Sequence, residues 1–284
     1  MRPIPALALM GLGTVGFGSW YKFHNLKPKT LKQYLEWQGL RLISDSESNY
    51  WKAVIEENKE LIVKLGIDVS IDRVKDWCKS HVNSEKYENI KSYALLLCVD
   101  NPKTVKARII QLDGGTDGLI QDPNSNQKYK VAYVFRKHIP GFNSLIGYHP
   151  KVDDNGKEKV VFEEATELFQ KWCIGSLEKP IDETLVLNIR EFCTPKNFSK
   201  IRDYLTGRPL LTDSGKETQL KERYNKISEF ASYKHDIRED YEDGLKKWCN
   251  QHLDEEFSTS LIVFEEILPK VISRCVEGSK SEEK

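Results

Sequence analysis

Three Trp-Cys dipeptides, each followed by a single Cys at a similar distance, constrain the fold of this chain more than any other feature of its sequence. They end the segments VKDWC, FQKWC and LKKWC. The resulting pairs account for all 6 cysteines: Cys78 with Cys98, Cys173 with Cys193, and Cys249 with Cys275. Because chance rarely distributes every cysteine so regularly, the pattern predicts an internally repeated architecture.

The Trp of each dipeptide lies beside its Cys on the apolar side of an amphipathic segment. We therefore expect Trp77, Trp172 and Trp248 to occupy equivalent buried positions, where a large aromatic side chain contributes much of the core of a small unit. In this interpretation the Trp and Cys residues are structural positions of the repeat.

Hydrophobic spacing predicts that each unit contains a short helix, a long helix, a helix that carries Trp-Cys and a helix that ends near the lone Cys. The predicted units span residues 30–98, 104–193 and 199–276, and the polar tail at 277–284 is expected to be disordered. The predicted fold class is mostly α, with an N-terminal membrane-spanning helix followed by a helical body of two to three divergent units.

Local signals place the helices of the first unit. A long helix is expected within 46–66 and ends at Gly66, Ser70 is expected to cap the Trp-Cys helix, and the lone-Cys helix is expected to run from Ser84 to Leu97. Two tripeptides have the chemistry of N-caps for the long helices of the first and third units, Ser44-Asp45-Ser46 and Thr212-Asp213-Ser214.

The middle unit is the divergent one because it contains two insertions, GGTDG at 114–118 and a loop at 141–159. Between them, segment 125–139 is compatible with a strand or a helix, and its helical neighbours favour a helix. Loops as long as 141–159 usually carry function or are mobile.

Residues 1–22 are predicted to be a transmembrane anchor or signal-like segment. From Pro3 to Tyr21 the chain has no charged residue, and this length is just enough to cross a bilayer as a helix. An uncleaved anchor is favoured, in contact with the lipid bilayer through residues 3–21. The orientation stays open. The lysines after the segment would place the body inside by the positive-inside rule, whereas a surface protein needs its body outside.

The same segment contains Gly11, Gly13 and Gly16 in the spacing of a dinucleotide-binding fingerprint. The acidic residue that would bind the ribose, Asp45, lies too far along the chain for that motif. The segment RLISDS that contains it recurs as PLLTDS without any glycine motif nearby. We therefore expect no nucleotide cofactor, and we interpret the glycines as small residues of a membrane helix.

Two Cys-x-x-His pairs, Cys78 with His81 and Cys249 with His252, could each supply half of a zinc site. The middle unit has Ser176 at the corresponding position, so a metal site is not part of the repeat. No metal ligand is expected.

A Cys-His hydrolase is the other catalytic alternative, with Cys98 or Cys193 as the nucleophile and His138, His149 or His235 as the base. Nothing in the sequence selects one thiol. All six cysteines are expected toward helix C-termini, where the helix dipole opposes a thiolate. We therefore expect no catalytic residue and no enzymatic activity.

The state of the cysteines can be predicted from helix geometry. If the Trp-Cys and lone-Cys helices of the first unit form an antiparallel hairpin that turns near Asn83, Cys78 and Cys98 lie roughly 15 Å apart along the helix axis. A disulfide needs Cα atoms closer than about 7 Å. This geometry predicts thiols that serve as small apolar core residues, or that pair at most between units. A disulfide within each unit, which the repeat itself suggests, is the less favoured alternative.

The apolar run ALALMGLGTVG, the S/T-D-S-x-x-x-W/Y element and the recurring W-C…C pattern together resemble the large paralogous families of uncharacterised proteins encoded by haemotropic mycoplasmas. The resemblance covers nearly the whole chain through short motifs. It implies a membrane-attached, surface-exposed protein of an expanded family, and it carries over no catalytic residue.

From this resemblance we expect a non-enzymatic surface protein for host interaction or antigenic variation, with a host-cell or plasma protein as its partner. No nucleic-acid partner is expected, because 43 basic and 43 acidic residues balance and no basic stripe is present. The alternatives are an anchored interaction protein that faces the cytosol and, less favoured, a metal-binding or Cys-His hydrolytic protein.

Overall fold

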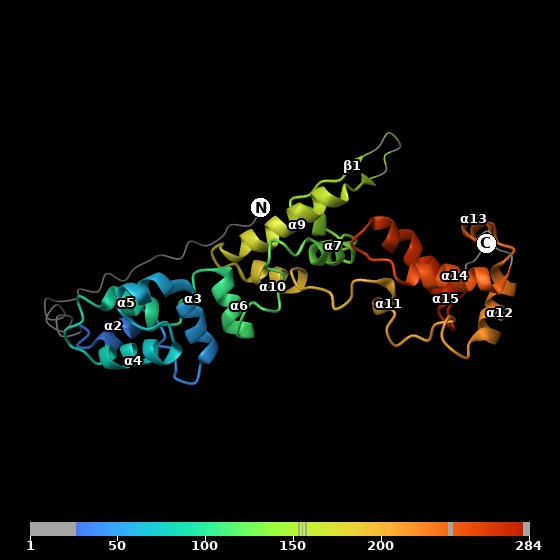
Figure 1. The fold of residues 1–284 in the computed structure, drawn as a ribbon. Helices are drawn as coiled ribbons and strands as arrows, with labels where there is room; N and C mark the ends of the chain where they lie inside the picture. Colours follow the sequence, from blue (N-terminus) through green and yellow to red (C-terminus); the bar gives the residue numbers. More distant parts are fainter. Residues whose placement is uncertain (1–26, 153, 155, 157, 238–240, 281–284) are drawn as a thin grey trace, which may run out of the picture. The chain divides into compact units, whose positions relative to one another are not determined.

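The computed structural model describes residues 27–280 apart from 153, 155, 157 and 238–240, and this part of the chain is mostly helical (Figure 1). The mostly α fold class is therefore confirmed. The predicted anchor at 1–22 lies outside the described residues. Of the helices within them, none has the length and apolar character needed to cross a membrane.

The chain divides into two compact bodies. The N-terminal body comprises residues 27–103 and Ile110–Gly114, and the C-terminal body comprises Thr104–Ile109 and 115–280. The helices of residues 27–103 are α2 (Leu31–Trp37), α3 (Ser48–Lys64), α4 (Ile71–Val82) and α5 (Lys91–Leu97).

The following helix, α6, spans Val105–Asp113, so each body contains part of it. The C-terminal body continues with α7 (Asn126–Val134), α8 (Phe142–Leu145), α9 (Phe162–Leu177), α10 (Glu183–Phe192), α11 (Ile201–Tyr204), α12 (Glu217–Ile227), α13 (Ala231–Asp236), α14 (Glu242–Leu253), the π-helix η1 (Val263–Ile267) and α15 (Leu268–Cys275). Strands β1 (Lys151–Val152) and β2 (Glu158–Lys159) pair antiparallel in a small hairpin inside the 141–159 insertion.

The same order of elements occurs three times, and we call these stretches repeat 1 (30–98), repeat 2 (104–193) and repeat 3 (199–276). The short helix is α2, α6 or α11, and the long helix is α3, α7 or α12. The Trp-Cys helix is α4, α9 or α14. The lone-Cys helix is α5, α10 or the continuous pair η1 and α15.

Two backbone hydrogen bonds recur at corresponding places of the three repeats. The first amide of each short helix donates to a carbonyl just after the Trp-Cys helix, in the pairs Leu31–Ser84, Val105–Lys179 and Ile201–Glu255, at 3.0, 3.0 and 3.1 Å. The amide of an apolar residue between the short and long helices donates to the carbonyl of the lone Cys, in the pairs Ile43–Cys98, Ile120–Cys193 and Leu211–Cys275, at 3.1, 2.7 and 2.8 Å. Since buried backbone groups need such partners, these bonds define the common framework of the repeats.

Each repeat contains its own cluster of buried apolar side chains, which includes both of its cysteines. In the C-terminal body, the side chains of Phe135 and Phe264 pack against the clusters of repeats 2 and 3. Their ring centroids lie 4.7 Å apart, in an edge-to-face arrangement.

Several local predictions are confirmed. Gly66 ends α3 with a φ of 70°, a left-handed conformation that glycine adopts without steric cost. The Ser70 hydroxyl accepts a hydrogen bond from the Arg73 amide and caps α4. Within the ambiguous segment 125–139, residues Asn126–Val134 form helix α7.

The Ser/Thr-Asp-Ser tripeptides are not N-caps. In repeat 1 the carboxylate of Glu47 accepts from the Ser44 amide at 2.7 Å, and in repeat 3 the carboxylate of Asp213 accepts from the Leu210 amide at 2.9 Å. Both carboxylates therefore close the turn that precedes the long helix. The prediction was wrong because the tripeptides form the turn itself, in repeat 3 with the Asp213 carboxylate as acceptor, and the long helices start further along the chain.

The predicted disorder of the tail is wrong for residues 277–279. The Glu277 amide donates to the Pro209 carbonyl at 3.0 Å, and the Lys216 ammonium binds the Glu277 carboxylate at 2.8 Å. These tertiary contacts order residues 277–279, for which the polar composition alone predicted disorder.

Candidate functional site

All six cysteines form disulfides inside their own repeats. The pairs are Cys78–Cys98, Cys173–Cys193 and Cys249–Cys275, with Cα atoms 5.6, 5.8 and 5.8 Å apart. No cysteine is free. The prediction that these thiols stay unpaired, or pair between units, is therefore wrong.

The wrong step was the tight turn between the Trp-Cys and lone-Cys helices. In repeat 1 the lone-Cys helix starts at Lys91 instead of Ser84, because the Ser84 carbonyl accepts from the Leu31 amide and the Tyr87 hydroxyl donates to the Pro28 carbonyl. Cys98 then lies about 10 Å along the helix from its start, and Cys78 lies roughly 6 Å before the end of α4, so the two levels differ by only about 4 Å. In repeats 2 and 3 the lone-Cys helices start at Glu183 and Val263, 10 and 12 residues before Cys193 and Cys275, so a late helix start accounts for the pairing in repeat 1 alone.

In every repeat, a side chain of the long helix or of the turn that directly follows it binds the carbonyl two residues before the lone Cys. In repeats 1 and 2, the Asn58 amide donates to Leu96 at 3.3 Å and the Arg136 guanidinium donates to Glu191 at 3.1 Å. In repeat 3 the donor is Arg223, which binds the Ser273 carbonyl. These three pairs, which we call the carbonyl clamps, supply donors to the end of a helix whose last carbonyls have none of their own.

Each of the two clamp arginines also binds the carbonyl of the residue that follows the lone Cys. Arg136 also donates to the Thr194 carbonyl at 2.9 Å, and Arg223 donates to the Val276 carbonyl at 3.4 Å. Burial lowers the pKa of both guanidinium groups, but the negative end of the helix dipole favours a cation there. Sequence inspection missed the clamps because asparagine stands in repeat 1 where the other repeats have arginine.

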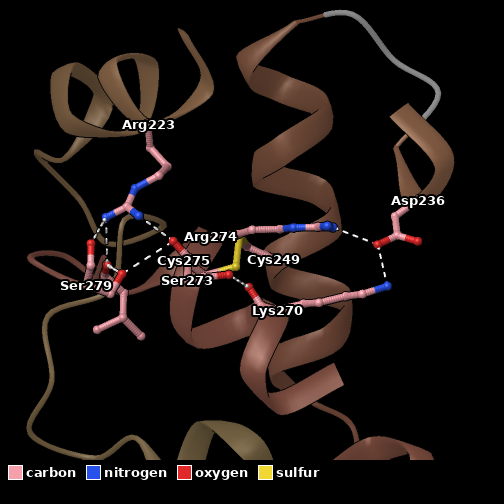
Figure 2. The surroundings of a disulfide bond; sticks show 9 residues. Arg223, Asp236, Cys249, Lys270, Ser273, Arg274, Cys275 and Ser279 are labelled. Carbon is pink, nitrogen blue, oxygen red and sulfur yellow. Dashed lines mark hydrogen bonds and ion pairs between the residues drawn. A yellow bond between two sulfur atoms is a disulfide. The ribbon is translucent and has the colours of Figure 1, made fainter. Parts of the chain in front are cut away.

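The disulfide of repeat 3 lies beside a buried group of charges (Figure 2). The Asp236 carboxylate binds the Lys270 ammonium at 2.7 Å and the Arg274 guanidinium at 2.8 Å. Arg274 is 0% exposed, and its guanidinium lies 4.8 Å from the ring centroid of Trp248, a cation–π contact. Burial by itself would raise the pKa of Asp236, but hydrogen bonds from Lys270, His235 and Arg274 lower it to about 2.

The three Trp side chains are not equally buried, so the predicted equivalence is wrong. Trp248 is 8% exposed, whereas Trp77 and Trp172 are only partly buried. The Arg274 guanidinium lies over the Trp248 ring and covers part of it.

Replacement of each Trp by Ala should reveal this difference. Trp248→Ala is expected to cost ~3–5 kcal/mol of unfolding free energy, and the same change at Trp77 or Trp172 somewhat less, because less area leaves water on folding. Urea unfolding of the three variants measures the loss of unfolding free energy at each position. Equal losses at all three positions would contradict it.

The residues considered for catalysis or metal binding do not assemble into such a site. The sulfurs of Cys78 and Cys249 are bonded to sulfur, and His81 and His252 instead pack on Trp77 and Trp248, with ring centroids 4.5 and 4.3 Å apart. Within the described part of the chain, no group of three or more His, Cys, Asp or Glu side chains could hold a metal ion.

The proposed hydrolytic pairs lack a thiol, because Cys98 and Cys193 are in disulfides. The three candidate bases are also committed elsewhere or exposed. His138 stacks on Phe264 at 5.4 Å, His149 is exposed, and His235 binds Asp236 at 3.0 Å. None of these three histidines therefore has a free cysteine thiol beside it.

Two hollows open on the surface of the C-terminal body. The larger, of about 620 Å³, lies over η1 and α15 with Phe264, Leu268 and Ile272 among its apolar residues. Burial lowers the pKa of His138 at its edge, and so does the neighbouring Lys137. The smaller, of about 430 Å³, lies between α7 and the segment 196–199 and is more polar.

Comparison of this chain with protein-family models, with curated proteins and with solved structures found no match.

Proposed function

We propose that this chain is a non-enzymatic, disulfide-stapled helical protein whose body lies outside the cytoplasm, where it binds a host component or is exposed to host antibodies. Residues 1–22 attach it to the membrane in this proposal. The observation that carries the proposal is the pairing of every cysteine within its own repeat.

Disulfides form and persist in oxidising compartments and are rare in the cytosol, where thiols are kept reduced. Three buried disulfides with no thiol left over therefore favour an extracytoplasmic body over the alternative of a cytosol-facing interaction protein. The same pairing removes the nucleophile that the hydrolytic alternative needs, which supports a role in binding.

Protease treatment of intact cells tests the location of the body. We expect trypsin to digest the body from intact cells, because the exposed lysines of its helices become accessible only if it is displayed outside. A cytosolic protein probed on the same blot serves as the control for cell integrity. Full protection of the body in intact cells, with digestion after lysis, would show that it faces the cytosol.

A further inference from the structure

We propose that the smaller hollow of the C-terminal body is a binding site for a phosphate monoester, in which the ammonium group of Lys196 contacts the anion. This hollow is lined by residues of α7, α11 and the segment 196–199. Its volume of about 430 Å³ falls in the usual range of small-molecule sites. The inference does not depend on the compartment of the protein.

Lys196 has the surroundings of an anion-binding cation. Its side chain is partly buried, and its ammonium group lies 5.9 Å from the ring centroid of Phe135. Within the described residues it forms no ion pair and no hydrogen bond. Burial lowers the pKa of Lys196, the nearby positive charge of Arg136 lowers it further, and the Glu191 carboxylate offsets part of this effect. An anion in the hollow would relieve both effects, because it would bring a negative charge to the ammonium group.

The neighbouring arginine adds to the positive potential. Arg136 is 4% exposed, and its guanidinium donates to the carbonyl oxygens of Ala132, Glu191 and Thr194 and to the Thr194 hydroxyl. Its hydrogen bonds are therefore made to dipoles, and although the Glu191 carboxylate offsets part of its charge, the guanidinium still adds positive potential at the hollow. In a partly buried site such charges are screened less than on the open surface.

The remaining lining residues suit an ester better than a bare ion. Lys128, Asn197 and Ser199 supply hydrogen-bond donors, while Val131 and Phe198 supply apolar surface for the organic part. The one carboxylate of the lining, Asp203, accepts from the Lys200 amide at 3.3 Å as part of the cap of α11. Phe198 is fixed by edge-to-face contacts with Phe135 and Tyr204, at 4.9 and 5.2 Å between ring centroids.

Equilibrium dialysis of the full-length chain, with its disulfides intact and in non-ionic detergent, tests the site with radiolabelled glycerol 3-phosphate. We expect saturable binding of one equivalent per chain, with unlabelled glycerol unable to compete. Lys196→Gln should weaken binding by roughly tenfold, since a hydrogen bond to a charged group contributes on that order. Lys171→Gln is the matched control, because Lys171 is an exposed lysine of the same body that pairs with Glu167 at 2.7 Å, and it should bind as the unchanged protein does.

A second arm distinguishes the source of the phosphate. Dihexanoyl phosphatidate, kept monomeric, should compete much more strongly than glycerol 3-phosphate if the natural ligand is a lipid headgroup, and equally or less strongly if it is a free ester. Melting curves of Lys196→Gln and Lys171→Gln establish that both variants are folded. The proposal is overturned if neither phosphate compound binds, or if folded Lys196→Gln binds as tightly as the unchanged protein.

Discussion

Reduction of the three disulfides is expected to unfold the helical body at room temperature. Each disulfide joins residues 20 or 26 positions apart, and closing a loop of that size in the unfolded chain contributes about 3 kcal/mol. Together they contribute roughly 9 kcal/mol, which is comparable with the whole unfolding free energy of a natural domain. Thermal melting followed by far-ultraviolet circular dichroism, with and without a phosphine reductant, measures the effect.

The control for this experiment is removal of one disulfide at a time. The double variant Cys173→Ala/Cys193→Ala should remain folded and lose about 3 kcal/mol, because the other two disulfides still constrain the chain. Retention of the full melting temperature after complete reduction, confirmed by thiol titration, would mean that the disulfides do not stabilise this fold.

Replacement of Asp236 by Ala is expected to cost ~3–5 kcal/mol, a large effect for one substitution. Its carboxylate binds both Lys270 and the fully buried Arg274 beside the Cys249–Cys275 disulfide. Without it, two cations of α15 lose the negative charge that offsets their burial, and they repel each other. Urea unfolding monitored by Trp fluorescence measures the loss.

Asp254→Asn supplies the matched control, because Asp254 also pairs with an arginine, Arg202 at 3.1 Å, but on the exposed surface. That substitution should change the unfolding free energy by less than about 1 kcal/mol. Comparable effects of Asp236→Ala and Asp254→Asn would contradict the assignment of Asp236 as the counter-ion of the buried arginine.

The pH dependence of stability follows from the same carboxylate. The pKa of Asp236 is about 2 in the folded protein, against an ordinary value of 3.8. The ionised form is therefore favoured by folding, so its contribution is fully present above about pH 4 and is lost as the pH falls toward about 2. The difference corresponds to about 2 kcal/mol. Asp236→Asn should lack this part of the acid-induced loss, and an unchanged pH profile would argue against the lowered pKa.

Local sequence signals were sufficient for the helices that they control. The N-cap at Ser70, the stop at Gly66 and the helical character of 126–134 follow from side-chain chemistry and apolar spacing within a few residues. The repeat itself was visible because Trp-Cys is a rare pair that recurs in register with a lone Cys.

The start of α5 and the carbonyl clamps depend on tertiary contacts, so they could not be predicted from local sequence. The segment 84–90 has the composition of a helix start, yet Leu31 and Pro28 bind its backbone and the Tyr87 hydroxyl, so α5 begins late. The late start of α5 brings Cys98 close to Cys78. It cannot be predicted from the residues near the helix start, because it depends on contacts with a distant segment. The carbonyl clamps are hidden for a similar reason, since only three-dimensional equivalence relates Asn58 to Arg136 and Arg223.

Peptide mapping of the non-reduced protein, alkylated at the moment of cell lysis, tests the pairing of the cysteines most directly. The structure predicts three linked peptides in good yield, Cys78 with Cys98, Cys173 with Cys193 and Cys249 with Cys275, and no alkylated cysteine. Alkylated Cys98 or Cys193, or a peptide that links cysteines of two different repeats, would contradict both the disulfide-stapled repeat and the extracytoplasmic role inferred from it.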